Sequence, residues 1–553
     1  MRRISFIVLK ALLLIFVAST LSLNLVGEDF DILIKNGKIV DGTGNPWFYN
    51  DIGIVGDKIV EIGDLAGKQA ARVIDAKGFI VSPGFIDVHT HCDGALWDSK
   101  YNSVINYVTQ GVTTIVVGNC GTGSYNIAEA KEQSEKLGIG INVALLAGFG
   151  TIRREVMGAE NRPASANELG EMKALLRQAM EEGAWGMSTG LQYIPHRFAS
   201  TEEIIEMAKK VSEFDGVFTS HQRDEGHPLL EAVQETIRIG HLTGVRINIS
   251  HLKAAGKSNW GLMQDAVDLI NEARARGIEI TADMYAYDKG GTVALGFIFE
   301  YPEDLLSEIR RKYEDENTYY ENFGNEIKKA LGDKINRDRI RRRTENGNPE
   351  ELNFVDMLGW HNFTIVNAKK NMTFVGKILS DLAQEQQKDA FDIAADLYVE
   401  EGSDIKISLA AMNEEDMKLA LKQDWLMISS DGNHITGYLR GAAHPRNYGS
   451  FPRVFRKYVR EEKILTLEQA VRKMTSLPAQ LLRLKDRGLL MPGHKADIVI
   501  FVQTEISDNA TYIDPFQFST GIEYVLINGK TSIENGEYNE SLNGKVLLHM
   551  KYE

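Results

Sequence analysis

The middle of the chain alternates strand-like runs with helix-like segments, and this alternation limits the possible folds more than any other feature. Segments with a helical pattern, such as 203–214 and 262–277, separate most of the runs. Strands that alternate with helices form parallel sheets, and eight of them can close a (β/α)8 barrel. We therefore predict an α/β fold with a TIM-like barrel over residues 83–480. The eight runs are GFIDVHTH (84–91), VTTIVVGNC (112–120), INVALLAG (141–148), AWGMSTGL (184–191), GVFTSHQR (216–223), RINISHLK (246–253), IEITADMYAY (278–287) and WLMISSDG (425–432).

One stretch interrupts the alternation. Residues 297–360 are charged and helical in pattern, and they separate the seventh run from the eighth. We predict an insertion here, over the mouth of the barrel. Its basic run RDRIRRR (337–343) is typical of a solvated helix face. The chain of 553 residues carries 62 basic and 77 acidic side chains, a net charge of −15, so we expect no nucleic-acid partner.

Both ends of the chain are rich in strand signals. Residues 28–82 and 481–553 contain short β-branched runs separated by Asn-Gly and Asp-Gly pairs, as in DILIKNGKIVDG (31–42) and IEYVLINGK (522–530). Such pairs are typical of tight β-hairpin turns. We predict that the two segments form the two parts of one small β-sandwich domain, although the whole barrel separates them in sequence.

The first 27 residues indicate an export signal. Arg2, Arg3 and Lys10 precede an apolar run at 11–18, and small or polar residues follow it. This order is typical of a signal peptide, and the run is shorter than the roughly 20 residues of a spanning helix. An uncleaved membrane anchor and a buried helix are the alternatives. We expect an exported protein, periplasmic or secreted, with N-terminal membrane association before or without cleavage.

Six polar residues stand at the carboxyl ends of the predicted strands. They are His89, His91, Cys120, His221, His251 and Asp431. The strand period of two places His89 and His91 on one face. In a parallel barrel all these strand ends meet at one rim, where active sites lie. Imidazoles, a thiolate and a carboxylate that converge in this way suit zinc.

The chain has two cysteines, and they allow two interpretations. Cys92 directly follows His91, so in an exported protein it can pair with Cys120 as a disulfide. We favour a metal-bound thiolate for Cys120, because zinc sites deprotonate such thiols. For Cys92 we expect a small packed residue near the rim.

Several motifs together carry a family resemblance. The chain resembles the amidohydrolase superfamily and, within it, the N-acyl-D-amino-acid deacylase (D-aminoacylase) family, over nearly everything from 31 to 530. The motifs are FIDVHTH (85–91), GVTTIVVGNCG (111–121), SHQRDEG (220–226), ISHLKAAGK (249–257), SSDG (429–432) and AAHPRNYGSFPRV (442–454). One position departs from the family, which usually has a histidine where this chain has Phe149. The departure concerns the lining near the third strand.

The resemblance implies a role for each rim residue. Cys120, His221 and His251 would hold one zinc ion tightly. His89 and His91 would form a second half of the site, weakly occupied or empty. Asp431 would be the catalytic acid/base that takes a proton from metal-activated water and returns one to the leaving amine.

The resemblance also implies the substrate, an N-acyl-D-amino acid whose amide bond is hydrolysed to a carboxylate and a free D-amino acid. Lys253, Tyr285 and Arg446 match positions that bind the substrate's α-carboxylate in this family. The stretch DKGGTVALGFIFEY (288–301) has no arginine and several apolar residues. It favours neutral or hydrophobic substrate side chains, and Lys289 is the residue that could reverse this preference.

Two other functions remain open from the sequence. A cyclic-amide hydrolase of the hydantoinase or dihydropyrimidinase type is the first alternative, but such enzymes usually carry a carboxylated lysine, and the fourth run, 184–191, has none. A noncatalytic binding protein on the same scaffold is the second, since a fold alone does not establish an activity.

Overall fold

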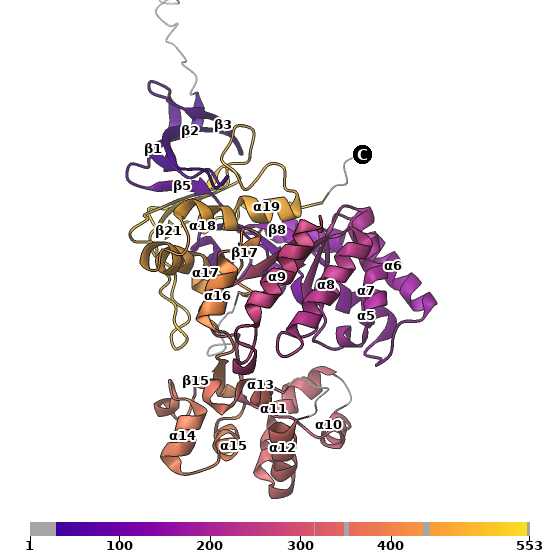
Figure 1. Cartoon of the computed structure of the whole chain (residues 1–553). Helices are drawn as coiled ribbons and strands as arrows, with labels where there is room; N and C mark the ends of the chain where they lie inside the picture. The colour runs from indigo at the N-terminus through magenta and orange to yellow at the C-terminus, as the bar shows by residue number, and fades with distance from the viewer. Residues whose placement is uncertain (1–28, 314–315, 348–352, 435–442, 550–553) are drawn as a thin grey trace, which may run out of the picture.

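The computed structural model describes residues 29–313, 316–347, 353–434 and 443–549 (Figure 1). The expected signal or anchor at 1–27 lies outside these residues. Among the described helices, none is long and apolar enough to cross a membrane.

All eight predicted barrel strands are present, and each lies within its predicted run. They are β6(Phe85–Asp87), β7(Val112–Val117), β8(Asn142–Leu145) continued by β9(Ala147–Gly148), β10(Gly186–Gly190), β11(Val217–His221), β12(Arg246–Ile249), β13(Ile280–Met284) and β17(Leu426–Ile428). Their residues are almost all buried, which explains why they form continuous apolar runs instead of alternating with polar residues.

The strands close into a parallel barrel. One sheet has the order β8-β7-β6 and the other the order β17-β13-β12-β11-β10-β9. At one seam β8 and β9 are successive pieces of the same stretch of chain. At the other seam Thr90 pairs in parallel with Gly432. The predicted barrel is therefore confirmed.

Amphipathic helices cover the outside of the barrel. The helices α6(Ala166–Glu181), α7(Thr201–Glu213), α8(Leu229–Thr243) and α9(Leu262–Ala275) pack side by side along one flank (Figure 1). The helix α6 begins where Ser165 accepts a hydrogen bond from the main-chain N–H of Glu168 and the Glu168 carboxylate accepts one from the N–H of Ser165. This capping box satisfies two main-chain donors that the helix cannot pair.

The two termini form one β-domain, as predicted. The N-terminal strands are β1(Phe30–Ile39), β2(Phe48–Val55), β3(Lys58–Gly63), β4(Ala70–Asp75) and β5(Ile80–Pro83), and the C-terminal ones are β18(Ile498–Phe501), β19(Ile522–Ile527), β20(Lys530–Glu534) and β21(Glu537–Tyr538). Antiparallel pairing of β5 with β18 joins the halves into a single nine-stranded sheet. Residues from both halves, including Ile34, Ile54 and Ile500, share one apolar core.

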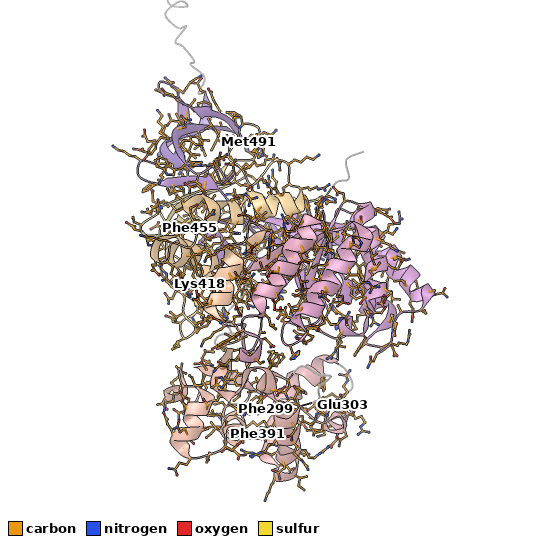
Figure 2. The ribbon with its side chains drawn as sticks, in the orientation of Figure 1. Phe299, Glu303, Phe391, Lys418, Phe455 and Met491 are labelled. Carbon is orange, nitrogen blue, oxygen red and sulfur yellow. The ribbon has the colours of Figure 1, made fainter. Side chains whose placement is uncertain are left out.

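Aromatic rings connect this β-domain to the barrel. Phe455, labelled in Figure 2, lies 5.6 Å from the ring of Phe85 on β6 and 4.9 Å from that of Phe501 on β18. Contacts between large buried rings contribute beyond the area that they remove from water. The domain therefore acts as a fixed support beside the first barrel strand.

The last described segment departs from the predicted domain boundaries. The strand β22(Val546–Leu547) pairs in parallel with β8, and the indole nitrogen of Trp185 donates to the carbonyl of Leu547 at 2.7 Å. The expectation that 481–553 lies wholly in the β-domain is wrong here, because this segment extends the barrel sheet. A two-residue strand carries no pattern that a sequence can reveal.

The insertion between the seventh and eighth strands is a separate unit, and it is larger than predicted. Its sheet joins β14(Thr292–Ala294), β16(Lys406–Leu409) and β15(Phe363–Asn367), so the unit spans 292–409 and the predicted 297–360 is too short at both ends. Its helices include α10(Glu303–Arg310), α11(Glu316–Gly332), α12(Lys334–Asn346), α14(Leu379–Gln386) and α15(Ala390–Glu401). Phe299 and Phe391 pack edge to face at 5.4 Å inside it (Figure 2).

The basic run of the insertion lies on α12, as the helix-face interpretation predicts. Arg337 pairs with Asp392 and Asp396, and Arg339 pairs with Asp304. These partners belong to the same unit, so the arginine charges are balanced locally.

Candidate metal centre

A cavity of about 530 Å³ lies between the carboxyl ends of the barrel strands and the 292–409 unit. Side chains of two kinds line it. The barrel contributes polar residues, including His91, Cys120, His221, His251 and Asp431. The inserted unit contributes an apolar wall of Val293, Phe297, Phe354, Met357, Leu358 and Leu409.

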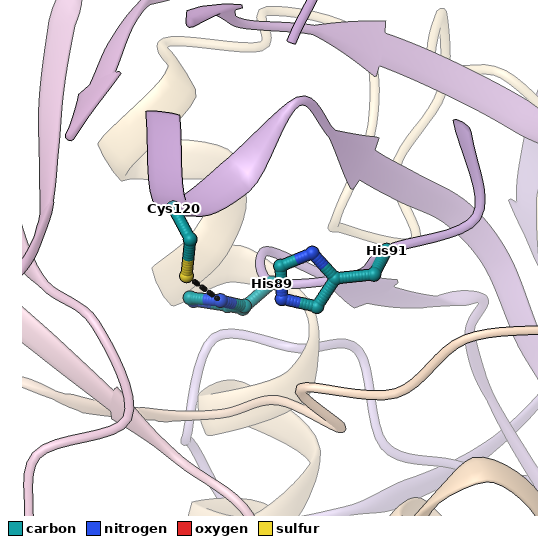
Figure 3. Close-up of side chains that lie close together, drawn as sticks. All are labelled: His89, His91 and Cys120. Carbon is teal, nitrogen blue, oxygen red and sulfur yellow. Dashed lines mark hydrogen bonds between the residues drawn. The ribbon is translucent and has the colours of Figure 1, made fainter. Parts of the chain in front are cut away.

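The predicted metal ligands come together at the barrel end of this cavity. The sulfur of Cys120 lies 3.4 Å from His89 Nε2, and 3.8 Å from both His221 Nδ1 and His251 Nε2. Figure 3 shows Cys120 with His89 and His91, which approach it from the end of the first barrel strand. Asp431 Oδ1 lies 3.2 Å from His91 Nε2 and 3.6 Å from His89 Nε2.

The donor set fits a metal ion. Three sets of ligand atoms each lie within 4.8 Å of one another: His89, His91 and Cys120; Cys120, His221 and His251; and His89, His251 and Asp431. Imidazole nitrogen, thiolate and carboxylate are the ligands that zinc accepts. Overlap between the sets is compatible with one ion or two.

Strained backbone presents three of these residues. Cys120, His251 and Asp431 have φ values of 52°, 36° and 46°, in a region that costs energy for residues other than glycine. Cys120 sits in the turn after β7, where Ser188 accepts a hydrogen bond from the next N–H, that of Gly121, at 2.9 Å. The turn aims the sulfur into the barrel instead of along its strand.

The cavity favours the ionised forms of the thiol and the carboxyl group. Burial alone raises the pKa of Cys120, but the charge of His89 and the contacts with the His221 and His251 imidazoles together outweigh it and hold that pKa well below its ordinary value. Burial likewise raises the pKa of Asp431, but the Arg446 guanidinium and the neighbouring histidines His251, His91 and His89 together outweigh it, so that pKa also lies well below its ordinary value. Both groups are therefore ionised and able to bind a cation.

The disulfide alternative is wrong, because both cysteines are free and buried. Cys92 is 1% exposed, as expected for a packed residue. Burial raises its pKa above the ordinary range, so the Cys92 thiol is neutral. Cys120 alone reaches the cavity.

Three of the four candidate ligand imidazoles face a polar side chain with their outer nitrogen. His221 Nε2 lies 2.9 Å from Gln192 Oε1, His251 Nδ1 lies 2.8 Å from Glu225 Oε1, and His89 Nδ1 lies 3.5 Å from Asp283 Oδ2. Such partners fix ring orientation and the nitrogen that faces the metal. Sequence reasoning missed all three residues. Only Glu225 lies in a motif, SHQRDEG, that points to it.

The three predicted carboxylate-binding residues also come together. Arg446 stacks over the ring of buried Tyr285 at 4.6 Å, and Lys253 lies 5.9 Å from the same ring. Neither cation is free: Arg446 pairs with Asp431 Oδ2 at 2.9 Å and Lys253 with Glu225 at 2.6 Å. Arg446 and Lys253 line the cavity, while Tyr285 lies behind them.

Phe149 does not reach the cavity. It is fully buried at the start of α5(Phe149–Met157), and its ring lies edge to face with that of His196 at 6.0 Å. His196 Nδ1 accepts a hydrogen bond from the N–H of Gly190 at 2.9 Å. The departure from the family pattern therefore changes the packing behind the third strand and leaves the ligand set intact.

Comparison with known proteins agrees with this geometry. The sequence model described as "Amidohydrolase family" matches residues 72–293 and 383–533. The chain belongs to the amidohydrolase family. The gap between the two matched ranges, 294–382, falls within the inserted unit.

The similar proteins are deacylases. The amidohydrolase is 31% identical to D-aminoacylase of Alcaligenes xylosoxydans xylosoxydans over 94% of this chain and 98% of that one, and 32% identical to N-acyl-D-glutamate deacylase of the same organism over 91% and 93%. The crystal structure of N-acyl-D-glutamate deacylase from Bordetella bronchiseptica, in complex with zinc and a phosphonate inhibitor, matches with a TM-score of 0.75 at 30% identity over 94% of this chain and all of that one.

Hydantoinases are more distant. A D-hydantoinase structure matches with a TM-score of 0.54 at 16% identity, a likeness of fold alone. The fourth strand, β10, contains no lysine, and Ser188 at its centre hydrogen-bonds to the Cys120 turn. The deacylase interpretation is therefore favoured over the cyclic-amide one.

Proposed function

We propose that this amidohydrolase cleaves the amide bond of N-acyl-D-amino acids and releases a carboxylate and a free D-amino acid. The observation that carries the proposal is one cavity that joins a Cys120–histidine ligand set, the Asp431 carboxylate and two cations beside Tyr285. A linear N-acyl amino acid needs this combination, because its scissile amide lies next to a free carboxylate. D-aminoacylase and the deacylases named above share most of the chain's length and support the assignment.

Cys120, His221 and His251 would hold one zinc ion tightly, and His89 and His91 would form a weaker second half. When bound there, zinc would lower the pKa of a water molecule and polarise a carbonyl group. Asp431 Oδ1 faces the ligand nitrogens, where it accepts a proton from the attacking water. It then returns a proton to the amide nitrogen, because without that proton the nitrogen would have to leave as an amide anion, a very poor leaving group.

Arg446 and Lys253 bind the substrate carboxylate in this proposal, and Tyr285, which lies behind them, positions both side chains. A guanidinium group offers two parallel donors to a carboxylate, and Arg446 lies against both the Tyr285 ring and Asp431. The carboxylate is thereby held close to the acid/base. With that group and the acyl carbonyl both fixed, only one enantiomer directs its side chain into the remaining space, which is the origin of D-selectivity.

The remaining space favours a hydrophobic side chain. The inserted unit faces the cavity with Val293, Phe297 and Leu409 among other apolar residues. Lys289 does not supply a charge there, because its Nζ donates to Thr364 Oγ1 at 3.2 Å and to Ser408 Oγ at 3.1 Å. The cation that could have favoured acidic substrates is thus bound to hydroxyl groups of the unit's own sheet.

The test compares kcat/KM of the zinc-loaded enzyme for N-acetyl-D-leucine, N-acetyl-D-methionine, N-acetyl-D-glutamate, the corresponding L-forms and hydantoins. We expect the two hydrophobic D-substrates to be preferred. A preference for D-glutamate would refute the hydrophobic selection but keep the deacylase proposal. A preference for L-forms or hydantoins would refute the proposed substrate class, and zinc binding without turnover of any of them would favour a binding protein.

We further propose that residues 1–27 direct export, to the periplasm or the outside, with cleavage or as an N-terminal anchor. The basic start and short apolar run of this segment support the proposal. Cell fractionation combined with N-terminal sequencing of the mature protein tests it. A cytoplasmic enzyme that retains Met1 or Arg2 would contradict it.

A further inference from the structure

Glu225 occupies a junction that the proposed mechanism does not use. It lies in the loop after β11, and its side chain is 13% exposed. A single oxygen, Oε1, meets both Lys253 Nζ at 2.6 Å and His251 Nδ1 at 2.8 Å. The main chain reinforces the contact, because the N–H of Ala255 donates to the carbonyl of Glu225 at 2.7 Å. Two loops at neighbouring strand ends are thereby joined at one carboxylate.

The hydrogen bonds at this junction decide which nitrogen of His251 carries its proton. A carboxylate only accepts hydrogen bonds, so the contact with Glu225 requires a proton on His251 Nδ1. The other nitrogen, Nε2, then carries a lone pair and faces Cys120 Sγ at 3.8 Å. A metal ligand needs that lone pair.

Lys253 makes Glu225 necessary. Its Nζ also lies 2.9 Å from His251 Nδ1, and an ammonium group can only donate. Without the carboxylate, Lys253 would donate to Nδ1 and the imidazole proton would move to Nε2, which faces the metal site. The ammonium would then favour the tautomer that cannot bind zinc.

We infer that Glu225 is a positioning residue that accepts hydrogen bonds from both Lys253 and His251 and so keeps the zinc-binding tautomer of His251. The inference rests on the proposed zinc-dependent function but concerns zinc affinity, which is measured without substrate. If no N-acyl-D-amino acid is hydrolysed, the deacylase proposal fails while this inference is still tested.

The experiment measures zinc affinity of the full-length protein by competition with a chromophoric chelator at fixed pH, with thermal unfolding as a check on folding. We expect Glu225→Met to weaken zinc binding about 10-fold or more, as loss of such partners typically does. Lys253→Met should leave zinc affinity within about twofold, because Glu225 still holds His251. The double variant should recover to within about threefold of the parent, since no ammonium competes for Nδ1.

A matched control separates positioning from general damage. Glu235 lies in the same part of the chain, is similarly buried and pairs with Arg223 at 2.9 Å, away from the cavity. Glu235→Met should not change zinc affinity. The inference is overturned if Glu225→Met binds zinc like the parent, if Glu235→Met weakens binding equally, or if the double variant binds as weakly as Glu225→Met. Should Glu225→Met fail to fold, the double variant decides: affinity near the parent supports the inference, and a 10-fold loss overturns it.

Discussion

Replacement of Asp431 by asparagine should have two measurable effects: a loss of acid–base catalysis, seen in kcat, and a loss of a buried ion pair, seen in the thermal midpoint. The substitution keeps the size of the side chain but removes its ability to accept and return a proton. General acid–base catalysis contributes about 10²–10⁴-fold, which corresponds to about 3–5 kcal/mol of activation free energy. We expect kcat of the zinc-loaded variant to fall by that factor, measured with N-acetyl-D-leucine and with zinc content determined on the same sample.

The same substitution should also destabilise the protein. Asp431 and Arg446 are 11% and 15% exposed at the side chain and lie 2.9 Å apart, and breaking a buried pair costs about 3–5 kcal/mol. The loss should be near the lower figure, because Arg446 keeps its hydrogen bond to the carbonyl of Gly290 at 2.9 Å and its contact with the Tyr285 ring. The thermal midpoint of the variant should therefore fall, and Arg446→Met in the same chain should restore it without restoring kcat.

A second carboxylate provides the control. Asp508, 2% exposed, pairs with Arg453 at 3.0 Å and Arg456 at 2.6 Å and does not line the cavity. Asp508→Asn should lower the thermal midpoint with little change in kcat. Near-parental turnover by zinc-loaded Asp431→Asn would remove Asp431 from the mechanism. Equal losses of kcat in Asp431→Asn and Asp508→Asn would show that destabilisation, not loss of the acid/base, lowers kcat.

Three further predictions follow from single contacts. Cys120→Ala should lower zinc content and activity together, and thiol titration of the metal-free parent should count both Cys120 and Cys92; a count of zero would contradict the thiolate site. Burial lowers the pKa of His196 to about 4, so between that pH and about 6.5 the unfolded chain binds the extra proton and stability falls as pH decreases. His196→Asn, which keeps an acceptor for the Gly190 N–H, should flatten the fall of the thermal midpoint over that range; an unchanged slope would exclude His196 as its cause. Ending the chain after Ser541 removes the strand paired with β8, and should lower the thermal midpoint more than it lowers kcat/KM at 25 °C; a larger effect on kcat/KM would show that the segment acts on the site.

The barrel and the rim residues could be predicted because, in a parallel barrel, the position of a residue along its strand decides whether it lies at the rim, however far apart the strands are in sequence. Each ligand stands at a strand end, and parallel strands in a barrel bring all their ends to one rim. Period-two alternation then decides which of His89, Thr90 and His91 share a face. The structure accordingly brings all nine predicted site residues to one end of the barrel. No short-range sequence pattern indicates which of these strands are neighbours.

Two of the three imidazole partners that sequence reasoning missed depend on loop conformation, whereas the third, Asp283, lies within β13. Gln192 and Glu225 follow strand ends within loops whose backbone dihedral angles carry no period. The limits of the inserted unit were missed for a related reason, because pairing of β14 with β16 depends on a contact between segments separated by the whole unit. Motifs could indicate that Lys253 and Arg446 matter, but only the folded structure shows that each has a carboxylate partner, Glu225 and Asp431 respectively.

Those partners connect substrate selection to the architecture of the whole chain. The carbonyl of Gly290, which holds Arg446, belongs to the segment that leads into the inserted unit. Lys289 anchors that segment to the unit's sheet, and Tyr512, on a loop from the C-terminal part of the β-domain, donates to Asp288 at 2.8 Å. The barrel supplies the metal ligands and the acid/base, but the position of the carboxylate-binding arginine depends on the two parts of the chain outside it. The same contacts therefore position both Arg446, which binds the carboxylate, and the apolar wall of the cavity. Changes in the inserted unit should alter substrate preference and KM together while leaving zinc affinity unchanged.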